Sequence, residues 1–472
     1  MSTQTMQPFA QGDVSRAQDM VPPQDLNALM LMSTLILLAA LGIGYMLAMS
    51  ATTPNDIFAQ PSAVLAVGLA LALWVEGSVA MRNLIRVDLF MLMVLYLLTF
   101  FEFLLPQDPV RNVVTTGSAQ LTVEIVILGF AGIVIGRHLA PVRRAMPRQV
   151  TLYNAPGATI LMLLACAVLG YFYMLLTVNF SLSELLFQMS RERFSQPWSR
   201  GQLGSLGVLL GELALLKFLI PPLAAAVLAQ WRRYRLWQLV LTGLILYLVL
   251  FESFASGTRN VFLSHMMTFL AAYALLSPKL TFAKAAAVFG PALIIGYFAI
   301  YYLPEIRTVG LRNFELAEAT SDSFFVDMNL VNISQLTDIF PAQYPFLGAE
   351  IPYTAAIRPI PRGLWPGKPE GLSLGIEEAL GVTGMTLSAT FVGELWMAGG
   401  TLAVGLAALI FGAVAGWWNR KALRARSNMD MILYATGFFP AGLCMRSFLS
   451  VAPALLPLIA FVIYRNIRFS LR

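Results

Sequence analysis

Basic residues that could bind a phosphate group lie in the polar segments between long apolar stretches of the chain. Arg259 ends a Gly-Thr-Arg turn, and Arg358 and Arg362 flank a Pro-Ile-Pro sequence. Lys368 and Arg446 lie in later polar segments. Because a guanidinium group presents a planar fork of N–H donors that matches phosphate oxygens in pairs, the set favours a convergent phosphate or pyrophosphate site. Taken singly, an arginine at such a position more often binds a lipid headgroup or forms an ion pair with a loop carboxylate. Secondary candidates in other segments are Arg191, Arg193 and Arg307.

Carboxylates at the ends of apolar stretches are candidates for a base that acts on a hydroxyl group. Glu394 lies in the run Thr-Phe-Val-Gly-Glu-Leu-Trp, where such a stretch begins. Ionisable side chains are costly inside a membrane, so each one needs a partner or a function. We predict a catalytic role for Glu394. For three other carboxylates we predict structural pairing, with Lys217 as a possible partner of the last one: Glu76, Glu124 and Glu212.

The sequence predicts neither a cofactor nor a metal ion. Two cysteines and two histidines are too few for a disulfide framework or a Cys/His metal site. The run Gly363–Pro369 contains a Gly-Lys pair, but its spacing and the proline after the lysine differ from a nucleotide-binding phosphate loop. The net charge of +6 is typical of cytoplasmic loops in a membrane protein, so we expect no nucleic-acid partner.

The elements that position these residues are predicted to be membrane-spanning helices. Hydrophobic residues make up 58% of the 472 residues, charged residues only 12%, and the mean hydropathy is +0.72, which excludes an ordinary soluble domain. A helix needs about 20 apolar residues to cross a bilayer. The pattern predicts an all-α polytopic membrane protein with about twelve transmembrane helices, at residues 28–50, 61–80, 87–105, 117–136, 157–178, 204–229, 236–254, 261–277, 285–303, 393–417, 429–445 and 447–464.

Four regions follow from these spans. Residues 1–27 are expected to form a flexible cytoplasmic tail, residues 28–303 hold nine helices, and residues 393–472 hold three more. Between them, residues 304–392 form one long loop. Phe and Leu recur among acidic residues at helical spacing from Phe314 to Phe340, which predicts amphipathic helices that lie on the membrane surface or cap the bundle.

The distribution of Lys and Arg predicts the orientation. With both termini inside, the inner segments contain 19 of these residues and the outer segments 11. Cytoplasmic loops are enriched in Lys and Arg. We therefore expect both termini in the cytoplasm and the loop 304–392 on the outer side of the membrane.

The segment Arg358–Pro369 resembles the loop motif of Wzy-type oligosaccharide repeat-unit polymerases, which make O-antigen and exopolysaccharide. It shows the family's order of Pro-Arg, Trp-Pro and Lys-Pro pairs. The Gly-Glu pair at 393–394 matches the start of the family's next span, and the Gly-Thr-Arg turn at 257–259 matches an upstream turn. Arg446 matches an arginine near the final hairpin. The resemblance extends from about residue 240 to the end of the chain.

This resemblance implies a GT-C-like fold and a metal-independent glycosyltransferase in the bacterial inner membrane. Such polymerases use undecaprenyl-pyrophosphate-linked oligosaccharide on the periplasmic face and transfer the growing chain to the incoming unit. A flippase and a chain-length regulator are possible partners. In this interpretation Glu394 is the base, and five residues bind the pyrophosphate: Arg259, Arg358, Arg362, Lys368 and Arg446.

Three other functions fit the sequence less well. An O-antigen ligase is expected to use a histidine in the long loop, and residues 304–392 contain none. A flippase or transporter often shows paired repeats and unusual residues at the membrane midplane, whereas no repeat is evident here. A purely structural membrane scaffold does not account for the loop rich in arginine and proline.

Overall fold

The structure, a computed structural model, is an all-helical bundle. It describes residues 23–78, 80–105, 107, 110, 113–142, 156–200, 210–278, 280–315, 327–360, 364–369, 371–381 and 387–470. No strand occurs among these residues. The helices are α1 (Pro23–Ser50), α2 (Pro54–Gly77), α3 (Val87–Thr99), α4 (Thr116–Gly136), α5 (Pro156–Thr177), α6 (Leu182–Met189), α8 (Ile220–Ala229), α9 (Leu236–Ala255), α10 (Arg259–Leu276), α11 (Phe282–Val309), α12 (Asn329–Ile339), α13 (Glu350–Ile357), α14 (Ile376–Ala379), α15 (Thr390–Leu423), α16 (Asn428–Thr436), α17 (Phe438–Arg446) and α18 (Val451–Ser470).

Eight helices in the described part of the chain are long and apolar enough to cross a membrane, which confirms the class of an all-α membrane protein. They coincide with eight of the predicted spans. The other four predicted spans correspond to α3, to α10, to α16 with α17, and to α18. The span predicted at 429–445 is broken at Gly437, where a Cβ atom would lie 2.2 Å from Nε1 of Trp418. The total of twelve spans therefore stays a prediction.

α4 packs closely against α15. A Cβ atom at Gly136 would lie 2.2 Å from the carbonyl oxygen of Leu409, and one at Gly412 would lie 2.3 Å from that of Ile133. Small residues at these positions let the two backbones meet, as is common between membrane helices. The first part of α15 is separated from the rest by a break at Gly399 and Gly400, where the backbone is not helical.

One helix of the long loop, α12, is packed into the bundle. Nearly every residue of α12 is buried, including polar ones. Asn329 donates to the carbonyl oxygen of Leu98 (2.7 Å), and Ser334 donates to Thr122 of α4 (2.8 Å). Of the two predicted placements, on the membrane surface or capping the bundle, α12 packs against the bundle, where hydrogen bonds satisfy its polar side chains inside the protein. Residues 316–326 of the predicted amphipathic stretch lie outside the described residues.

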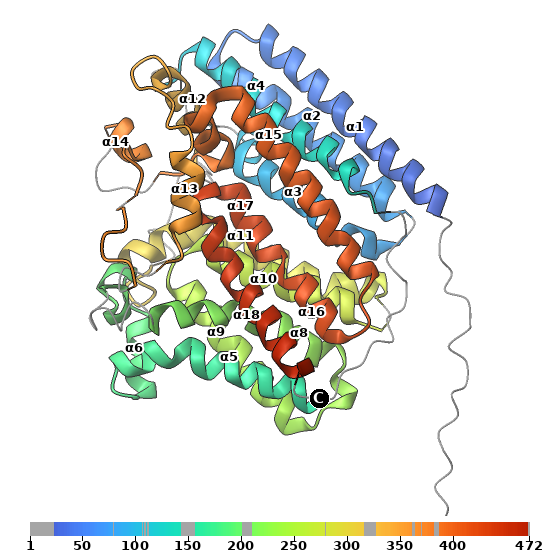
Figure 1. Ribbon diagram of the computed structural model, residues 1–472, viewed down its shortest axis with the longest axis vertical. Coiled ribbons are helices and arrows are strands. Elements are labelled where there is room, and N and C mark those ends of the chain that lie inside the picture. The colour runs from blue at the N-terminus through green and yellow to red at the C-terminus, as the bar shows by residue number, and fades with distance from the viewer. Residues whose placement is uncertain are drawn as a thin grey trace, which may run out of the picture.

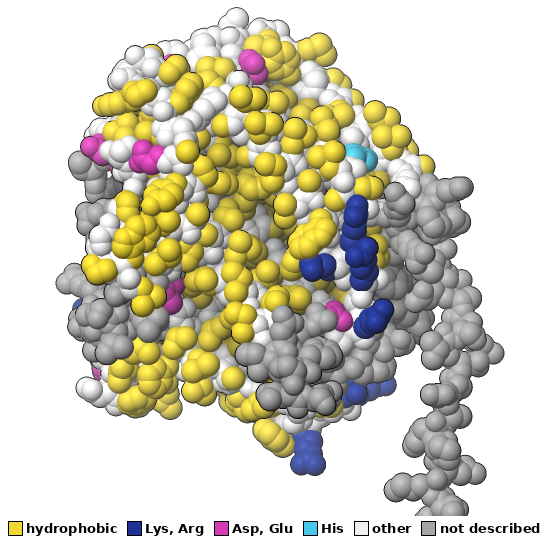
Figure 2. All heavy atoms as spheres, viewed as in Figure 1, with side chains coloured by type: hydrophobic (Ala, Val, Ile, Leu, Met, Phe, Trp, Pro, Cys, Tyr) yellow, Lys and Arg dark blue, Asp and Glu magenta, His cyan; other side chains and the backbone are white. Residues whose placement is uncertain are grey.

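Figure 1 shows how the two ends of the bundle differ. The start of α1 and the end of α18 lie toward the right-hand end in this view, whereas α6, α12, α13 and α14 lie on the left-hand side. On the face drawn in Figure 2, Lys and Arg side chains gather toward the right-hand end and the middle is mostly hydrophobic. The two termini of the bundle therefore share one end, and elements of the long loop lie at the other.

A network of buried charges joins the helices at the end where α1 begins. Glu76 of α2 pairs with Arg86 and accepts a hydrogen bond from Arg137 (2.9 Å). Asp88 of α3 pairs with Arg86 and accepts from Asn419 of α15 (2.6 Å). Arg137 also donates to backbone and hydroxyl oxygens of α1. The four charged side chains are at most 2% exposed, and two carboxylates balance two guanidinium groups. The count of Lys and Arg used to predict the orientation assigns Arg86 and Arg137 to inner loops. In the structure, both side chains are buried in this network.

The pairing of the other intramembrane charges differs from the prediction. Lys217 forms an ion pair with Glu252 of α9 (2.6 Å), not with Glu212. Residues 212 and 217 are poorly spaced to meet on one helix, and part of this segment is a 3₁₀ helix, η7 (Leu213–Leu219). Glu124 is exposed on α4 instead of paired in the core. The ring of His265 packs on Phe218, with centroids 4.6 Å apart.

Candidate functional site

Asp327, just before α12, joins two of the predicted arginines. Its Oδ1 lies 2.7 Å from Nη2 of Arg259, the first residue of α10, and its Oδ2 lies 3.3 Å from Nε of Arg446, the last residue of α17. The amide oxygen of Asn260, in the orientation that satisfies its hydrogen bonds, accepts from Nε and Nη1 of Arg446. Residues that are far apart in sequence therefore meet at one carboxylate.

Two of the secondary candidates, Arg193 and Arg307, lie near Arg259 and Arg446. Arg193, in the 3₁₀ turn η5 (Arg193–Ser195), donates to the hydroxyl of Thr258 (3.0 Å). Arg307, in the last turn of α11, lies over the ring of Phe194, 5.4 Å from its centroid. Burial and the nearby charges of Arg307 and Arg446 lower the pKa of Arg193. A bound anion relieves such crowding of like charges. We name this set the arginine cluster: Arg193, Arg259, Arg307 and Arg446.

The packing of the arginine cluster explains why the turn between α9 and α10 has the sequence Gly-Thr-Arg. Gly257 has a φ of +62°, and a Cβ atom there would lie 2.4 Å from Cα of Arg307. Only glycine combines this backbone conformation with such close packing against α11. Thr258 receives the hydrogen bond of Arg193, and Arg259 binds Asp327. All three residues of the motif thus contribute to the geometry of one site.

Glu394 lies in the short first part of α15, before the break in that helix, and is only 5% exposed. Its Oε1 accepts from the hydroxyl of Ser447 (2.7 Å), and its Oε2 accepts from the backbone N–H of Leu449 (3.1 Å). Because Ser447 directly follows Arg446, this carboxylate holds the turn that carries an arginine of the cluster. The charge of Arg358 also acts on Glu394. Each carboxylate oxygen has a second lone pair, so the group can accept a further hydrogen bond.

The remaining basic candidates have contacts within their own loops. Arg358 is exposed at the end of α13. Lys368 Nζ donates to the carbonyl oxygens of Arg358 (2.8 Å) and Ile360 (2.9 Å), which closes this loop on itself. Arg191 is exposed and donates to Gln188 (3.1 Å). Arg362 lies outside the described residues, so its predicted role is not addressed by the structure.

Two carboxylates accompany the arginine cluster, Asp327 and Glu102, and the sequence did not indicate that either lies beside these arginines. Glu102, in the 3₁₀ turn η2 (Phe101–Leu104), accepts from the backbone N–H of Met328 (3.3 Å). Glu102 and Asp327 both act on the charge of Arg259. Four arginines and two carboxylates leave a net charge of +2 when all are ionised, which is the sign needed to bind a diphosphate group. Nothing in the sequence indicates which of its carboxylates lies near which arginine.

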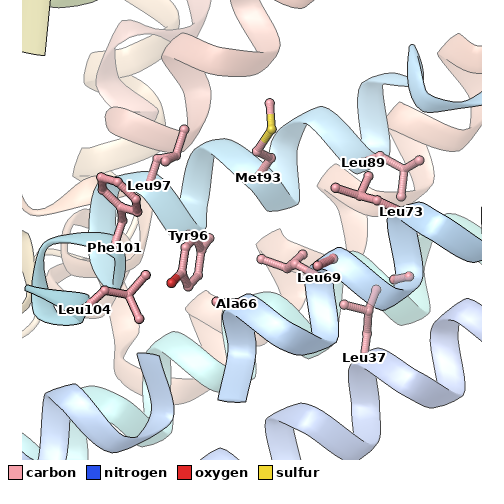
Figure 3. A pocket seen from close by; sticks show the side chains of 12 residues that line it. Leu37, Ala66, Leu69, Leu73, Leu89, Met93, Tyr96, Leu97, Phe101 and Leu104 are labelled. Carbon is pink, nitrogen blue, oxygen red and sulfur yellow. The ribbon is translucent and has the colours of Figure 1, made fainter. Parts of the chain in front are cut away.

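An apolar groove of about 310 Å³ ends beside the element that carries Glu102. Figure 3 shows Tyr96, Phe101 and Leu104 at one end and leucines of α1, α2 and α3 at the other. The hydroxyl of Tyr96 is bound to the carbonyl oxygen of Ser62 (3.1 Å), which leaves the lining mostly hydrocarbon. Phe101 and Leu104 belong to η2, the same turn that carries Glu102.

Within the described ranges, no group of three or more His, Cys, Asp or Glu side chains is placed to hold a metal ion. Comparison of the chain with protein-family models, with curated proteins and with solved structures found no match. The candidate site is therefore defined by its own geometry: a partly buried arginine cluster beside a buried carboxylate, at one end of an all-helical membrane protein.

Proposed function

We propose that this protein is a glycosyltransferase of the Wzy type, which polymerises undecaprenyl-pyrophosphate-linked oligosaccharide repeat units and has a GT-C-like fold with about twelve spans. The observation that carries the proposal is the convergence of four arginines from separate parts of the chain beside the turn held by Glu394. The resemblance of the loop at Arg358–Pro369 to the polymerase motif supports the same function.

The arginine cluster would bind the pyrophosphate of the donor lipid. Guanidinium groups from η5, α10, α11 and α17 face one region, so they can contact oxygens on both phosphates. In the transfer step the bond between the anomeric carbon and the phosphate oxygen breaks, and the lipid pyrophosphate leaves with the electron pair. Fixed cationic donors stabilise the charge that develops on this leaving group. Arg358, Arg362 and Lys368 would extend the site on the loop side.

Glu394 would act on the acceptor. The terminal sugar hydroxyl of the incoming unit forms the new bond to the anomeric carbon, and its proton passes to the carboxylate of Glu394. The network around Glu394 favours this role, because Ser447 and Leu449 fix the carboxylate beside the turn of Arg446. Rigid placement of base and phosphate-binding groups lowers the entropic cost of bringing donor and acceptor together.

The hydrocarbon part of the donor lipid suits the groove between α1, α2 and α3. Its lining is apolar, and its end at η2 lies next to Glu102, which binds the backbone beside Asp327. A lipid chain in this groove would have its polar end near the arginine cluster.

The proposed location is the bacterial inner membrane, with both termini cytoplasmic and the long loop periplasmic. Basic side chains gather at the end of the bundle where the described chain begins and ends, as Figure 2 shows for one face. This distribution agrees with the enrichment of Lys and Arg in cytoplasmic loops. A flippase would supply the substrate to the outer face, and a chain-length regulator would act on the product.

Labelling of single cysteines tests this orientation. We expect Ser183→Cys in α6 and Ala425→Cys after α15 to react with membrane-impermeant reagents from opposite sides, in a chain whose buried Cys166 and Cys444 are replaced by alanine. Ser183→Cys should label in intact cells, and Ala425→Cys only after the inner membrane is opened. Labelling of both from the same side would contradict the proposed topology.

A purified-protein assay with one lipid-linked repeat unit tests the function. We expect the wild-type chain to form polymer without a nucleotide sugar, and Arg446→Lys to lower kcat/KM roughly 10- to 100-fold, the effect of losing about 1.5–3 kcal/mol of charge-assisted hydrogen bonding. Lysine keeps the charge but cannot bind through two nitrogens as Arg446 does. The matched control is Arg424→Lys, the same substitution at an exposed residue after α15 that has no predicted role in the site, for which we expect nearly full activity.

The same assay separates the alternatives. A ligase would require a lipid A-core acceptor, and a flippase would move the lipid-linked unit without forming a glycosidic bond. Absence of polymer from well-folded wild-type protein, with transport of the substrate in vesicles, would contradict the polymerase function. Equal activity of Arg446→Lys and wild type would remove this arginine from the donor site.

A further inference from the structure

The carboxylate of Asp327 has the geometry of an anion bound to the arginine cluster. One of its oxygens contacts Arg259 at 2.7 Å and the other contacts Arg446 at 3.3 Å, so it bridges two guanidinium groups as a phosphate would. Because the contact to Arg446 is the longer one, the carboxylate interacts less closely with Arg446 than with Arg259.

The cluster keeps a positive charge even with Asp327 in place. Arg193 and Arg307 lie close by, and Glu102 is the other carboxylate that acts on Arg259. The site is also open to a ligand: the side chains of Arg259, Asp327 and Arg446 are 16%, 17% and 28% exposed. An incoming group with two or more negative charges can therefore reach the guanidinium groups and compete with a single carboxylate.

The backbone next to Asp327 is held in an unfavourable conformation. Met328 has a φ of +51°, in the left-handed region that side chains other than glycine rarely adopt. Its N–H is bound by Glu102 at 3.3 Å, and α12 begins at the next residue. Such strain persists where the surroundings impose it and is often found at functional sites. The strained residue therefore lies directly beside the carboxylate that bridges Arg259 and Arg446.

We propose that Asp327 is an internal counter-ion, a positioning residue that occupies the pyrophosphate site before the donor binds and is displaced by it. This inference rests on the proposed function, because it assigns the displaced carboxylate to the donor site. Asp327 keeps Arg259 and Arg446 in place while the site is empty. It also lowers their affinity for anions that carry less charge than a diphosphate, including phosphate groups of ordinary membrane lipids.

Binding of inorganic pyrophosphate to the purified full-length protein tests this inference. Dissociation constants are compared by calorimetry at constant ionic strength, since surface charge effects depend on salt. We expect Asp327→Asn to bind roughly tenfold more tightly, because the fraction of empty, binding-competent sites rises. Asp327→Glu, which retains the carboxylate, should stay close to wild type. The matched control is Asp338→Asn, the same loss of charge at an exposed residue of α12.

Steady-state kinetics separate displacement from a purely structural role. The KM for the lipid-linked donor should fall in Asp327→Asn without a rise in kcat, because a tighter site also releases its diphosphate product more slowly. Loss of structural support would instead raise KM. Asp327→Ser provides a second neutral replacement if the asparagine variant does not fold, with thermal unfolding as the measure of folding.

Each outcome decides between the hypotheses. If wild type binds pyrophosphate and neutral variants bind it equally or more weakly, Asp327 is not a displaced counter-ion and the proposed donor site survives. If Asp327→Glu also binds more tightly, the carboxylate is not the competitor. If neither wild type nor the neutral variants bind pyrophosphate, the donor site itself is wrong, and the inference fails with it.

Discussion

Glu394→Gln is expected to reduce polymerisation by roughly 100-fold or more while donor binding stays intact, the usual scale for loss of a general base. Glutamine has nearly the same shape and can still accept a hydrogen bond from Ser447 or Leu449, so the turn that carries Arg446 should remain in place. The measurement is the rate of polymer formation by purified protein, together with the affinity for inorganic pyrophosphate. The variant must reach the membrane at wild-type abundance.

The matched control for this prediction is Ser447→Ala. This change removes the 2.7 Å hydrogen bond to Glu394 but keeps the carboxylate. If Glu394 is the base, Ser447→Ala should lower the rate far less than Glu394→Gln does. Equal losses in the two variants would indicate that Glu394 only positions the turn of Arg446. Near-normal polymer from Glu394→Gln would remove it from the reaction altogether.

Glu76→Ala is expected to lower the free energy of unfolding by about 3–5 kcal/mol, the usual cost of removing one partner from a buried ion pair. The substitution leaves Arg86 and Arg137 without a carboxylate that both of them contact inside the bundle. Asp88 alone cannot balance two guanidinium groups. Thermal unfolding in detergent and abundance in the membrane measure the effect.

Glu124→Ala provides the comparison for the buried network, because it makes the same change at an exposed position of α4. We expect it to unfold at a temperature close to that of wild type. Equal unfolding temperatures of Glu76→Ala and wild type would show that water or a rearranged side chain compensates the buried charges. Loss of abundance in both variants would mean that any carboxylate in these helices matters, irrespective of its ion pairs.

The charge network and the arginine cluster differ in what they can do. In the network, carboxylates and guanidinium groups are equal in number and fully buried, so it stabilises the packing of α1 to α4 on α15. In the cluster, arginines outnumber carboxylates and the side chains are partly exposed. An unbalanced and accessible set of charges can bind an anionic ligand, whereas the charges of a balanced and buried set are already paired with one another.

The sequence by itself determined the class of the protein and most of its helices. Long apolar stretches must form helices in a membrane, because each backbone group has to be satisfied within its own segment. This local requirement explains why α1, α4, α5 and α9 lie where the pattern predicts them. It also allowed the arginines to be selected as candidates, since a charged side chain near an apolar stretch is unusual in itself.

Only the tertiary structure decided which of these side chains meet. The pairing of Asp327 with Arg259 and Arg446, and of Lys217 with Glu252, joins different helices, and no local pattern encodes such contacts. The burial of α12 likewise depends on partners in α3 and α4. Apolar length is a property of one segment, whereas an ion pair depends on how separate segments pack. For this reason the candidates for the site could be predicted from the sequence, and the composition of the arginine cluster could not.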